Sequence, residues 1–336
     1  MGNVYASAAY RELGDRLRRV RENAGLSSTE LARKVDWHIT KLSRIEHGWR
    51  PSSTIDVILY VVCCGLSMTA AKPYVEMVKR AERKQGFYLS DGRIGGSLQS
   101  LIYHESAADR SIIYEPHLIH GLLQTPEYAR ARILAINPNI AGERLAAAIR
   151  TRMERRRLLD RSNPARFTFY IHEQALQLRV GIEEVMHEQL LQLVLMAALD
   201  NVTVRIVPRQ AGEFGDGFHL MEFVQHRPIV YLDNLRFGGL VLEDTDYVNS
   251  YRELVPMLAD VALNEGQSRE FAAELAYAYD RGSQRGVTDL LAEEQLQQRR
   301  GNGLRGGGLA EEQPEQRRGN QLRGGGLVEP PTPIYE

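Results

Sequence analysis

The chain has 336 residues, of which 43% are hydrophobic, and its 42 basic and 43 acidic side chains leave a formal net charge of −1. This length and apolar content suffice for two globular domains, each with its own core. No stretch approaches the roughly 18–20 apolar residues of a membrane span, and no basic segment followed by a long apolar run marks a secretory signal. A cytoplasmic protein that does not enter a membrane is therefore expected.

Two short helices joined by a tight turn are predicted over residues 26–48. Ser27 and Glu30 have the Ser-x-x-Glu spacing of a capping box, which starts the first helix. Asp36 falls in the turn, where Asp tolerates a left-handed backbone, and Gly48 ends the second helix. The apolar side chains that the helical spacing turns inward are Leu31, Ala32, Val35, Leu42 and Ile45.

The second of these helices turns a mostly polar face outward, made of Ile39, Thr40, Lys41, Ser43 and Arg44. Such a unit typically lays its second helix in the major groove of DNA, although the pattern alone also fits a helical hairpin without that function. Charge favours DNA. The first 85 residues carry fifteen basic and nine acidic side chains, a net +6, whereas the remaining 251 residues carry −7.

Four segments extend this pattern into a longer signature: Leu17–Glu22, Gly25–Ser27, Glu30–Ala32 and Leu42–Gly48. In these segments the chain resembles the XRE-type (Cro/repressor-like) helix-turn-helix family. The resemblance implies an all-α, five-helix bundle over residues 1–86, whose other helices are expected at 11–23, 53–63 and 73–84. It also implies that Arg21 and Glu46 form a structural ion pair between the first helix and the recognition helix.

Two positions depart from this family, which often has Gln or a similar polar residue at the start of both helices. Here Ser28 and Ile39 occupy those positions. Ser28 can still meet a phosphate. Ile39 either touches a thymine methyl group or packs under Trp37. Base recognition is therefore expected mainly from the polar residues of the second helix. The full set of predicted DNA-contacting residues is Ser28, Thr29, Ile39, Thr40, Lys41, Ser43, Arg44 and Arg50.

A mixed α+β domain with a small sheet is predicted over residues 87–283, because helical and strand-like patterns alternate there. Strands are expected at 111–116, 167–171 and 202–207, and a hairpin at 218–224 and 228–233. Helices are expected at 95–107, 126–135, 141–160, 183–199, 244–263 and 267–281.

The strongest local signature of this domain joins Tyr114–Pro116 to Gly121–Ala131, with further marks at 173–176, 201–208 and 218–233. Here the chain resembles an actinobacterial C-terminal domain of unknown function that follows XRE-type modules in many regulators, WhiJ-like proteins among them. The resemblance implies a transcriptional regulator. It also implies, for some members, an antitoxin-like protein that binds a small partner protein. It provides no catalytic residue.

Gln124 and Tyr128 are the candidate effector- or partner-binding residues of this domain. Thr125 is placed to cap the helix that Pro126 opens, whereas Gln124 has no evident structural role in the sequence. The alternative is that Gln124 only bonds to local backbone.

Enzyme motifs do not emerge from the sequence. His104, His172 and His187 each precede a Glu, but none has the second His four residues on that a zinc-binding helix requires. No phosphate-binding loop or nucleophile elbow is found either. No catalytic residue, metal or cofactor is therefore expected. His117, His120 and His219 are interpreted as isolated structural residues, and Arg155–Arg157 as a solvated helix face rather than a phosphate site.

A tandem repeat marks the tail predicted over residues 284–336, since the 18 residues 291–308 recur at 309–326 with three differences. The repeat is rich in Gly, Gln and Arg and lacks the apolar content of a core, so disorder is expected. Two interpretations of the repeat are possible: a duplication without a function, or a tail that binds another molecule.

These features together predict a sequence-specific regulator that binds double-stranded operator DNA through residues 1–86 and an effector or partner through residues 87–283. The alternative is an antitoxin-like protein-interaction module whose main task is to hold a small partner protein. A second copy of the chain is also a possible partner, in a homodimer.

Overall fold

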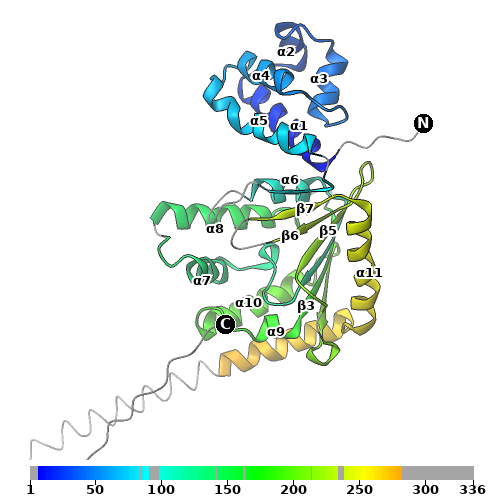
Figure 1. Cartoon of the computed structure of the whole chain (residues 1–336). Helices are drawn as coiled ribbons and strands as arrows, with labels where there is room; N and C mark the ends of the chain where they lie inside the picture. Colours follow the sequence, from blue (N-terminus) through cyan, green and yellow to red (C-terminus); the bar gives the residue numbers. More distant parts are fainter. Residues whose placement is uncertain are drawn as a thin grey trace, which may run out of the picture. The chain divides into compact units, whose positions relative to one another are not determined.

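A helical bundle and an α/β domain with one mixed sheet make up the chain (Figure 1). The computed structural model describes residues 7–83, 85–90, 98–140, 142–161, 164–212, 214–233 and 238–281. The predicted class, an all-α bundle followed by a mixed α+β domain, is confirmed. The predicted repeat tail lies outside the described residues. Within them, no helix has the length and apolar character to cross a membrane.

The bundle consists of α1 (Ala8–Asn23), α2 (Ser28–Lys34), α3 (Ile39–Glu46), α4 (Thr54–Cys63) and α5 (Met68–Glu82). The predicted capping box of Ser27 and Glu30 is confirmed, and Asp36 adopts φ +54° in the turn as expected. The predicted start of the last helix at residue 73 is wrong by five residues. Ser67 is the N-cap of α5, where its side chain accepts a hydrogen bond from the backbone N–H of Ala70, and Pro73 lies within the helix.

Close packing of α1 against α3 explains two glycines. A Cβ added at Gly14 would lie 2.5 Å from the carbonyl oxygens of Ile45 and Glu46, so the two helix backbones nearly touch there. At Gly48, which ends the turn after α3 with φ +67°, a Cβ would lie 2.6 Å from Cα of Arg11. The first and third helices are therefore packed with their backbones in close contact.

The α/β domain is built on a seven-stranded sheet in the described part of the chain, with the order β1-β7-β6-β5-β2-β3-β4. Strands β2, β3 and β4 are parallel, and the other pairs are antiparallel. The predicted hairpin of β5 and β6 is confirmed. The strands are β1 (Phe87–Leu89), β2 (Arg110–Glu115), β3 (Arg166–His172), β4 (Val202–Val207), β5 (Phe218–Glu222), β6 (Ile229–Leu232) and β7 (Leu240–Leu242).

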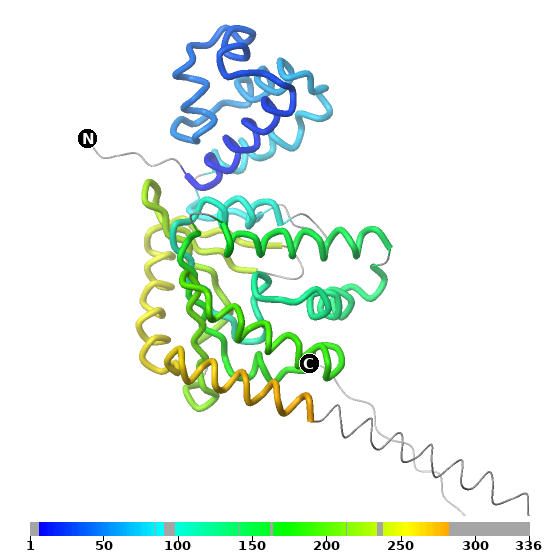
Figure 2. The backbone as a smooth tube through the Cα atoms, turned by 180° about the vertical axis from the view of Figure 1, so that it is seen from behind, coloured from blue at the N-terminus to red at the C-terminus, as the bar shows by residue number. Residues whose placement is uncertain are grey.

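Helices cover both faces of this sheet (Figures 1 and 2). Side chains alternate along β2, so Ile113 joins the core under α10 while Ile112 and Tyr114 join the core under α11. The helices are α6 (Gln99–Ala107), α7 (Pro126–Ile136), α8 (Gly142–Arg156), α9 (Glu173–Gln177), α10 (Glu183–Met196) and α11 (Thr245–Val261), and residues 265–281 are also helical. Short 3₁₀ turns lie at Gly121–Leu123 and Arg209–Ala211.

A buried polar network joins α1 to the α/β domain. The carboxylate of Glu12 accepts hydrogen bonds from the hydroxyls of Tyr88 (3.2 Å) and Ser100 (2.9 Å). The Tyr88 hydroxyl also lies 2.7 Å from Nε2 of His104 on α6. All four residues are at most 5% exposed. The bundle and the sheet domain are therefore in contact through β1 and α6.

Candidate functional site

The candidate nucleic-acid surface is formed by α3 and the start of α2. His38 caps α3 by accepting a hydrogen bond from the backbone N–H of Thr40. Of the predicted DNA-contacting residues, Thr29, Ile39, Thr40, Arg44 and Arg50 are exposed, and Ser28, Lys41 and Ser43 are half-buried. The structure therefore leaves all eight accessible, to different degrees.

Lys41 is held within the protein rather than free. Its Nζ lies 2.7 Å from Oδ1 of Asp56 on α4 and 3.9 Å from the centre of the Trp37 ring. A DNA phosphate would have to compete with this carboxylate. Ile39 is 41% exposed, and Lys41 lies over the Trp37 ring. The contact of Ile39 with a thymine methyl group stays a prediction.

Arg44 is the exposed cation of the recognition helix. Among the ion pairs of the described residues, none includes Arg44. Its guanidinium is therefore available for a bidentate contact to a guanine edge or for a phosphate.

Arg21 and Glu46 form a buried, two-point ion pair between α1 and α3. Nε of Arg21 lies 2.7 Å from Oε1 of Glu46, and Nη2 lies 3.0 Å from Oε2. The Tyr60 hydroxyl donates to the same carboxylate, and Nη1 of Arg21 donates to the carbonyl of Leu26. The hydrogen bond that Arg21 donates to Glu46 raises the pKa of Arg21. Burial, followed by the hydrogen bond to Glu46, raises the pKa of Tyr60. This geometry holds the recognition helix in place.

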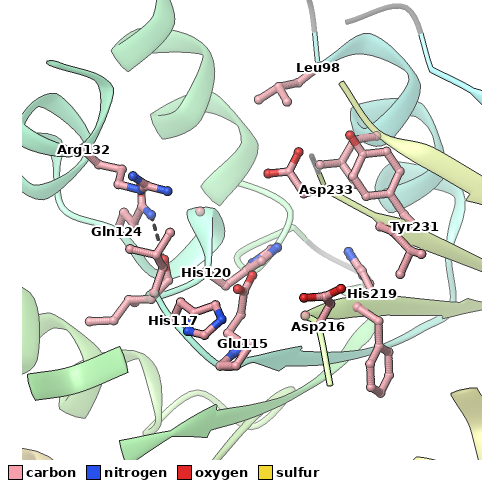
Figure 3. A pocket seen from close by; sticks show the side chains of 18 of the residues that line it. Leu98, Glu115, His117, His120, Gln124, Arg132, Asp216, His219, Tyr231 and Asp233 are labelled. Carbon is pink, nitrogen blue, oxygen red and sulfur yellow. Dashed lines mark hydrogen bonds between the residues drawn. The ribbon is translucent and has the colours of Figure 1, made fainter. Parts of the chain in front are cut away.

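A cavity of about 440 Å³ opens in the α/β domain, where β2 and β6 end and β5 and β7 begin (Figure 3). Basic side chains reach it from the helices and acidic side chains from the strand ends. The basic group is Arg132 on α7 with Arg152 and Arg155 on α8, and the acidic group is Glu115, Asp216 and Asp233. In Figure 3, Arg132 lies across the cavity from Asp233.

Arg155 is neutralised by Glu105 of α6. Two contacts join them, Nε to Oε2 at 3.0 Å and Nη2 to Oε1 at 2.7 Å, and both residues are buried. Burial lowers the pKa of Arg155, but the Glu105 carboxylate outweighs burial and leaves the pKa raised. The prediction that Arg155–Arg157 form a solvated face is therefore wrong for Arg155, which is only 6% exposed.

His120 and His219 meet Glu105 beside the cavity, so the expectation that these histidines are isolated is wrong. Their nearest ligand atoms and that of Glu105 all lie within 4.8 Å of one another. Burial, followed by the charge of Arg155, lowers the pKa of His219 to about 3, and burial also lowers the pKa of His120. Both rings are therefore neutral at neutral pH. Both ring nitrogens of His219 are buried without a hydrogen-bond partner among the described residues.

The His120–His219–Glu105 cluster has the residue types of a metal site but not its electrostatics. Both oxygens of Glu105 already accept from Arg155, and Arg152 lines the same cavity. A divalent cation would face these guanidinium groups at short range, which the low dielectric of a buried site makes costly. The residues present fit a metal poorly.

Gln124 and Tyr128, the predicted binding residues, are separated by the structure. Gln124 lines the cavity, where its amide donates to the carbonyl of Ile119 (2.7 Å) and its oxygen accepts from Nη1 of Arg152 (2.6 Å). It therefore bonds local backbone and also orients a cavity cation. Tyr128 instead lies fully buried in the core and away from the lining. Thr125 caps α7 as predicted.

Burial and neighbouring like charges disfavour the charged forms of Glu115 and Arg152, which line the cavity. Burial, followed by the charge of Asp233, raises the pKa of Glu115 to about 8. Burial, followed by the charge of Arg155, lowers the pKa of Arg152 to about 10. Sequence reasoning missed these residues, although the i, i+3 spacing of Arg152 and Arg155 on α8 was a usable signal that they share a helix face.

The fold and these two features define a helix-turn-helix protein with a cavity-bearing α/β domain. Residues 12–70 match the family model described as a helix-turn-helix domain, which indicates DNA binding. Residues 98–274 match the model described as a domain of unknown function (DUF5753). Because this second match covers more than half of the chain, the chain belongs to the DUF5753 family. No curated protein matches the chain.

Proposed function

We propose that this protein is a sequence-specific transcriptional regulator of the XRE type. In this proposal α3 reads the major groove of operator DNA, and the cavity of the α/β domain binds an effector without transforming it. The observation that carries the DNA-binding part is the recognition helix itself. It exposes Arg44 while the buried pair of Arg21 and Glu46 fixes its position.

The contact through α6 supports a link between the cavity and the DNA-binding bundle. His104 of α6 touches Tyr88, whose hydroxyl donates to Glu12 of α1. The next residue, Glu105, pairs with Arg155 at the cavity. A ligand that moves Glu105 therefore acts on a helix that also holds α1.

The alternative is a WhiJ-like, antitoxin-like role in which the second domain holds a small partner protein. The lining favours a small effector, because its charged groups lie within a concave space of ligand size rather than on a flat face. The proposal places the protein in the cytoplasm. It also expects a homodimer, since helix-turn-helix dimers read two half-sites one helical turn apart.

Selection of bound sites from random duplex DNA, followed by fluorescence anisotropy on the selected site, tests the DNA-binding part. Arg44→Ala should cost about 1–3 kcal/mol of binding free energy and relax sequence preference. Lys41→Ala should cost less, because Asp56 already satisfies the ammonium group. Lys79→Ala is the matched control. It removes an exposed charge of the same bundle that pairs with Glu76.

Two results would contradict this proposal. One is the failure of any duplex sequence to enrich. The other is an Arg44→Ala variant that binds the selected site as tightly as the parent, or that loses no more affinity than the control Lys79→Ala.

A further inference from the structure

The cavity contains cations that the protein itself leaves unneutralised. Arg132 and Arg152 both line it, and within the described ranges no carboxylate lies within ion-pair distance of either guanidinium. Among the described residues, the side-chain hydrogen bond of Arg152 is to the neutral amide of Gln124. A guanidinium that is withdrawn from water without a counter-charge attracts an anionic ligand.

Carboxylates gather at the strand ends of the same cavity. Glu115 ends β2, Asp216 precedes β5, and Asp233 follows β6. For the part of the chain that the structure describes, none of the three has an ion-pair partner. Burial is the main cause of the raised pKa of Glu115, and the charge of Asp233 adds to it. This group attracts a cationic ligand.

His219 adds a neutral hydrogen-bonding group between these charges. It is only 4% exposed, lines the cavity, and has both ring nitrogens without a partner among the described residues. A neutral imidazole offers one donor and one acceptor, and leaving both unmade in a buried place is costly. An occupant of the cavity would satisfy them.

We propose that the cavity binds a small zwitterion, an amino acid or dipeptide, whose carboxylate meets Arg132 and Arg152 and whose ammonium group meets the carboxylates at the strand ends. This deepens the proposed function by naming the chemical class of the effector, and it rests on that function only in calling the ligand an effector. A singly charged ligand would neutralise one group and leave the other unpaired. The volume of about 440 Å³ lies in the range of small-ligand sites.

Thermal-shift measurements on the full chain provide the first test. The probes are the twenty standard L-amino acids and a set of glycine-containing dipeptides at millimolar concentration. At least one probe should raise the melting temperature. The N-acetyl derivative of the best probe lacks the ammonium group, and its amide derivative lacks the carboxylate. Each derivative should bind roughly tenfold to a hundredfold more weakly, because each loses a charge-assisted contact.

Variants locate the ligand in this cavity. Arg152→Gln and Asp233→Asn should each raise the Kd of the best probe by at least roughly tenfold. Arg150→Gln is the matched control, since Arg150 lies on the same helix, is exposed, and pairs with Glu143 outside the cavity. If Arg152→Gln does not fold, Arg152→Lys keeps the charge and should retain measurable binding. The comparison of derivatives requires no variant.

Proton release gives an independent readout. An ammonium group placed beside Glu115 would lower the pKa of that carboxyl, while Arg132 and Asp233 face it unchanged. Calorimetry at neutral pH in buffers of different ionisation enthalpy should therefore show protons released on binding, and Glu115→Gln should abolish the release.

The proposal is overturned if no amino acid or dipeptide stabilises the chain. It is also overturned if the N-acetyl or the amide derivative binds as well as the parent ligand, because the site would then recognise one charge only. A third contrary result is binding of Zn²⁺ at the cluster of His120, His219 and Glu105 when the zwitterions do not bind. DNA binding is measured separately. A zwitterion that binds without changing operator affinity supports this site and refutes only the effector role.

Discussion

Replacing Glu46 by Gln should destabilise the chain strongly, because among the described residues the change leaves the buried Arg21 guanidinium with only the exposed carboxylate of Glu22, 3.7 Å away, as a counter-charge. Arg21 is 7% exposed and Glu46 5%, and two contacts of 2.7 and 3.0 Å join them. Removing one partner of such a buried pair costs about 3–5 kcal/mol of folding free energy. At about 2–4 °C per kcal/mol for a large domain, the melting temperature should fall by roughly 6–20 °C.

Thermal melts of the full chain are the measurement, because α1 also bonds to Tyr88 and Ser100 outside the bundle. Tyr60→Phe should cause a smaller loss, since it removes one hydrogen bond to Glu46 and leaves the ion pair. Glu30→Gln is the control, as Gln also completes a capping box. If Glu46→Gln melts like the parent but no longer binds the selected duplex, Glu46 contacts DNA and the structural reasoning is wrong.

Two further predictions concern backbone strain and pH. Gly48→Ala should lower the melting temperature more than Gly25→Ala, because both have positive φ but only at Gly48 would a Cβ meet backbone, at 2.6 Å from Cα of Arg11; equal losses would contradict the predicted overlap. Burial raises the pKa of Glu115 to about 8. Between about pH 5 and 8 the folded chain therefore retains a proton on Glu115 that the unfolded chain has lost. The contribution of this group to the free energy of unfolding falls as the pH rises through this range. Glu115→Gln should therefore gain stability relative to the parent across this range, and chemical denaturation that finds a constant difference would exclude the raised pKa.

The bundle could be predicted from the sequence because its signals are local. A capping box and a turn residue that tolerates positive φ lie within a few positions of the helices they define, as at Ser27, Glu30 and Asp36. The pairing of Lys41 with Asp56 had no such signal. The two residues lie on different helices, and only the packing of α4 brings them together.

The cavity could not be predicted in the same way, because its residues converge through strand pairing. His219 comes beside β2 only because β5 pairs antiparallel with it, with His219 opposite Ile113. The strands β1 and β7 have three residues each, too few for an alternating pattern to be recognised. Because these two strands were not predicted, neither the edge of the sheet nor the cavity at the start of β7 could be located from the sequence.

Helical spacing gives α6 two functional faces. Ser100 and His104, four residues apart, both lie in the polar network around Glu12 of α1. Leu101 lines the cavity, and Glu105, four residues later, reaches the cavity residue Arg155. Side chains four apart share a helix face, and adjacent ones are about 100° apart. A shift of α6 therefore changes both contacts together.

This arrangement sets a condition on any effector. A ligand moves an equilibrium only by the difference in its affinity for the two states, so tight binding in the cavity is not enough to alter DNA affinity. The ligand must favour one position of α6 over another. Glu105 is where that preference would arise, because a ligand carboxylate bound at Arg152 would lie near Arg155, the cation that pairs with Glu105. An anion that competes with Glu105 for Arg155 would loosen α6 and with it the face that holds α1.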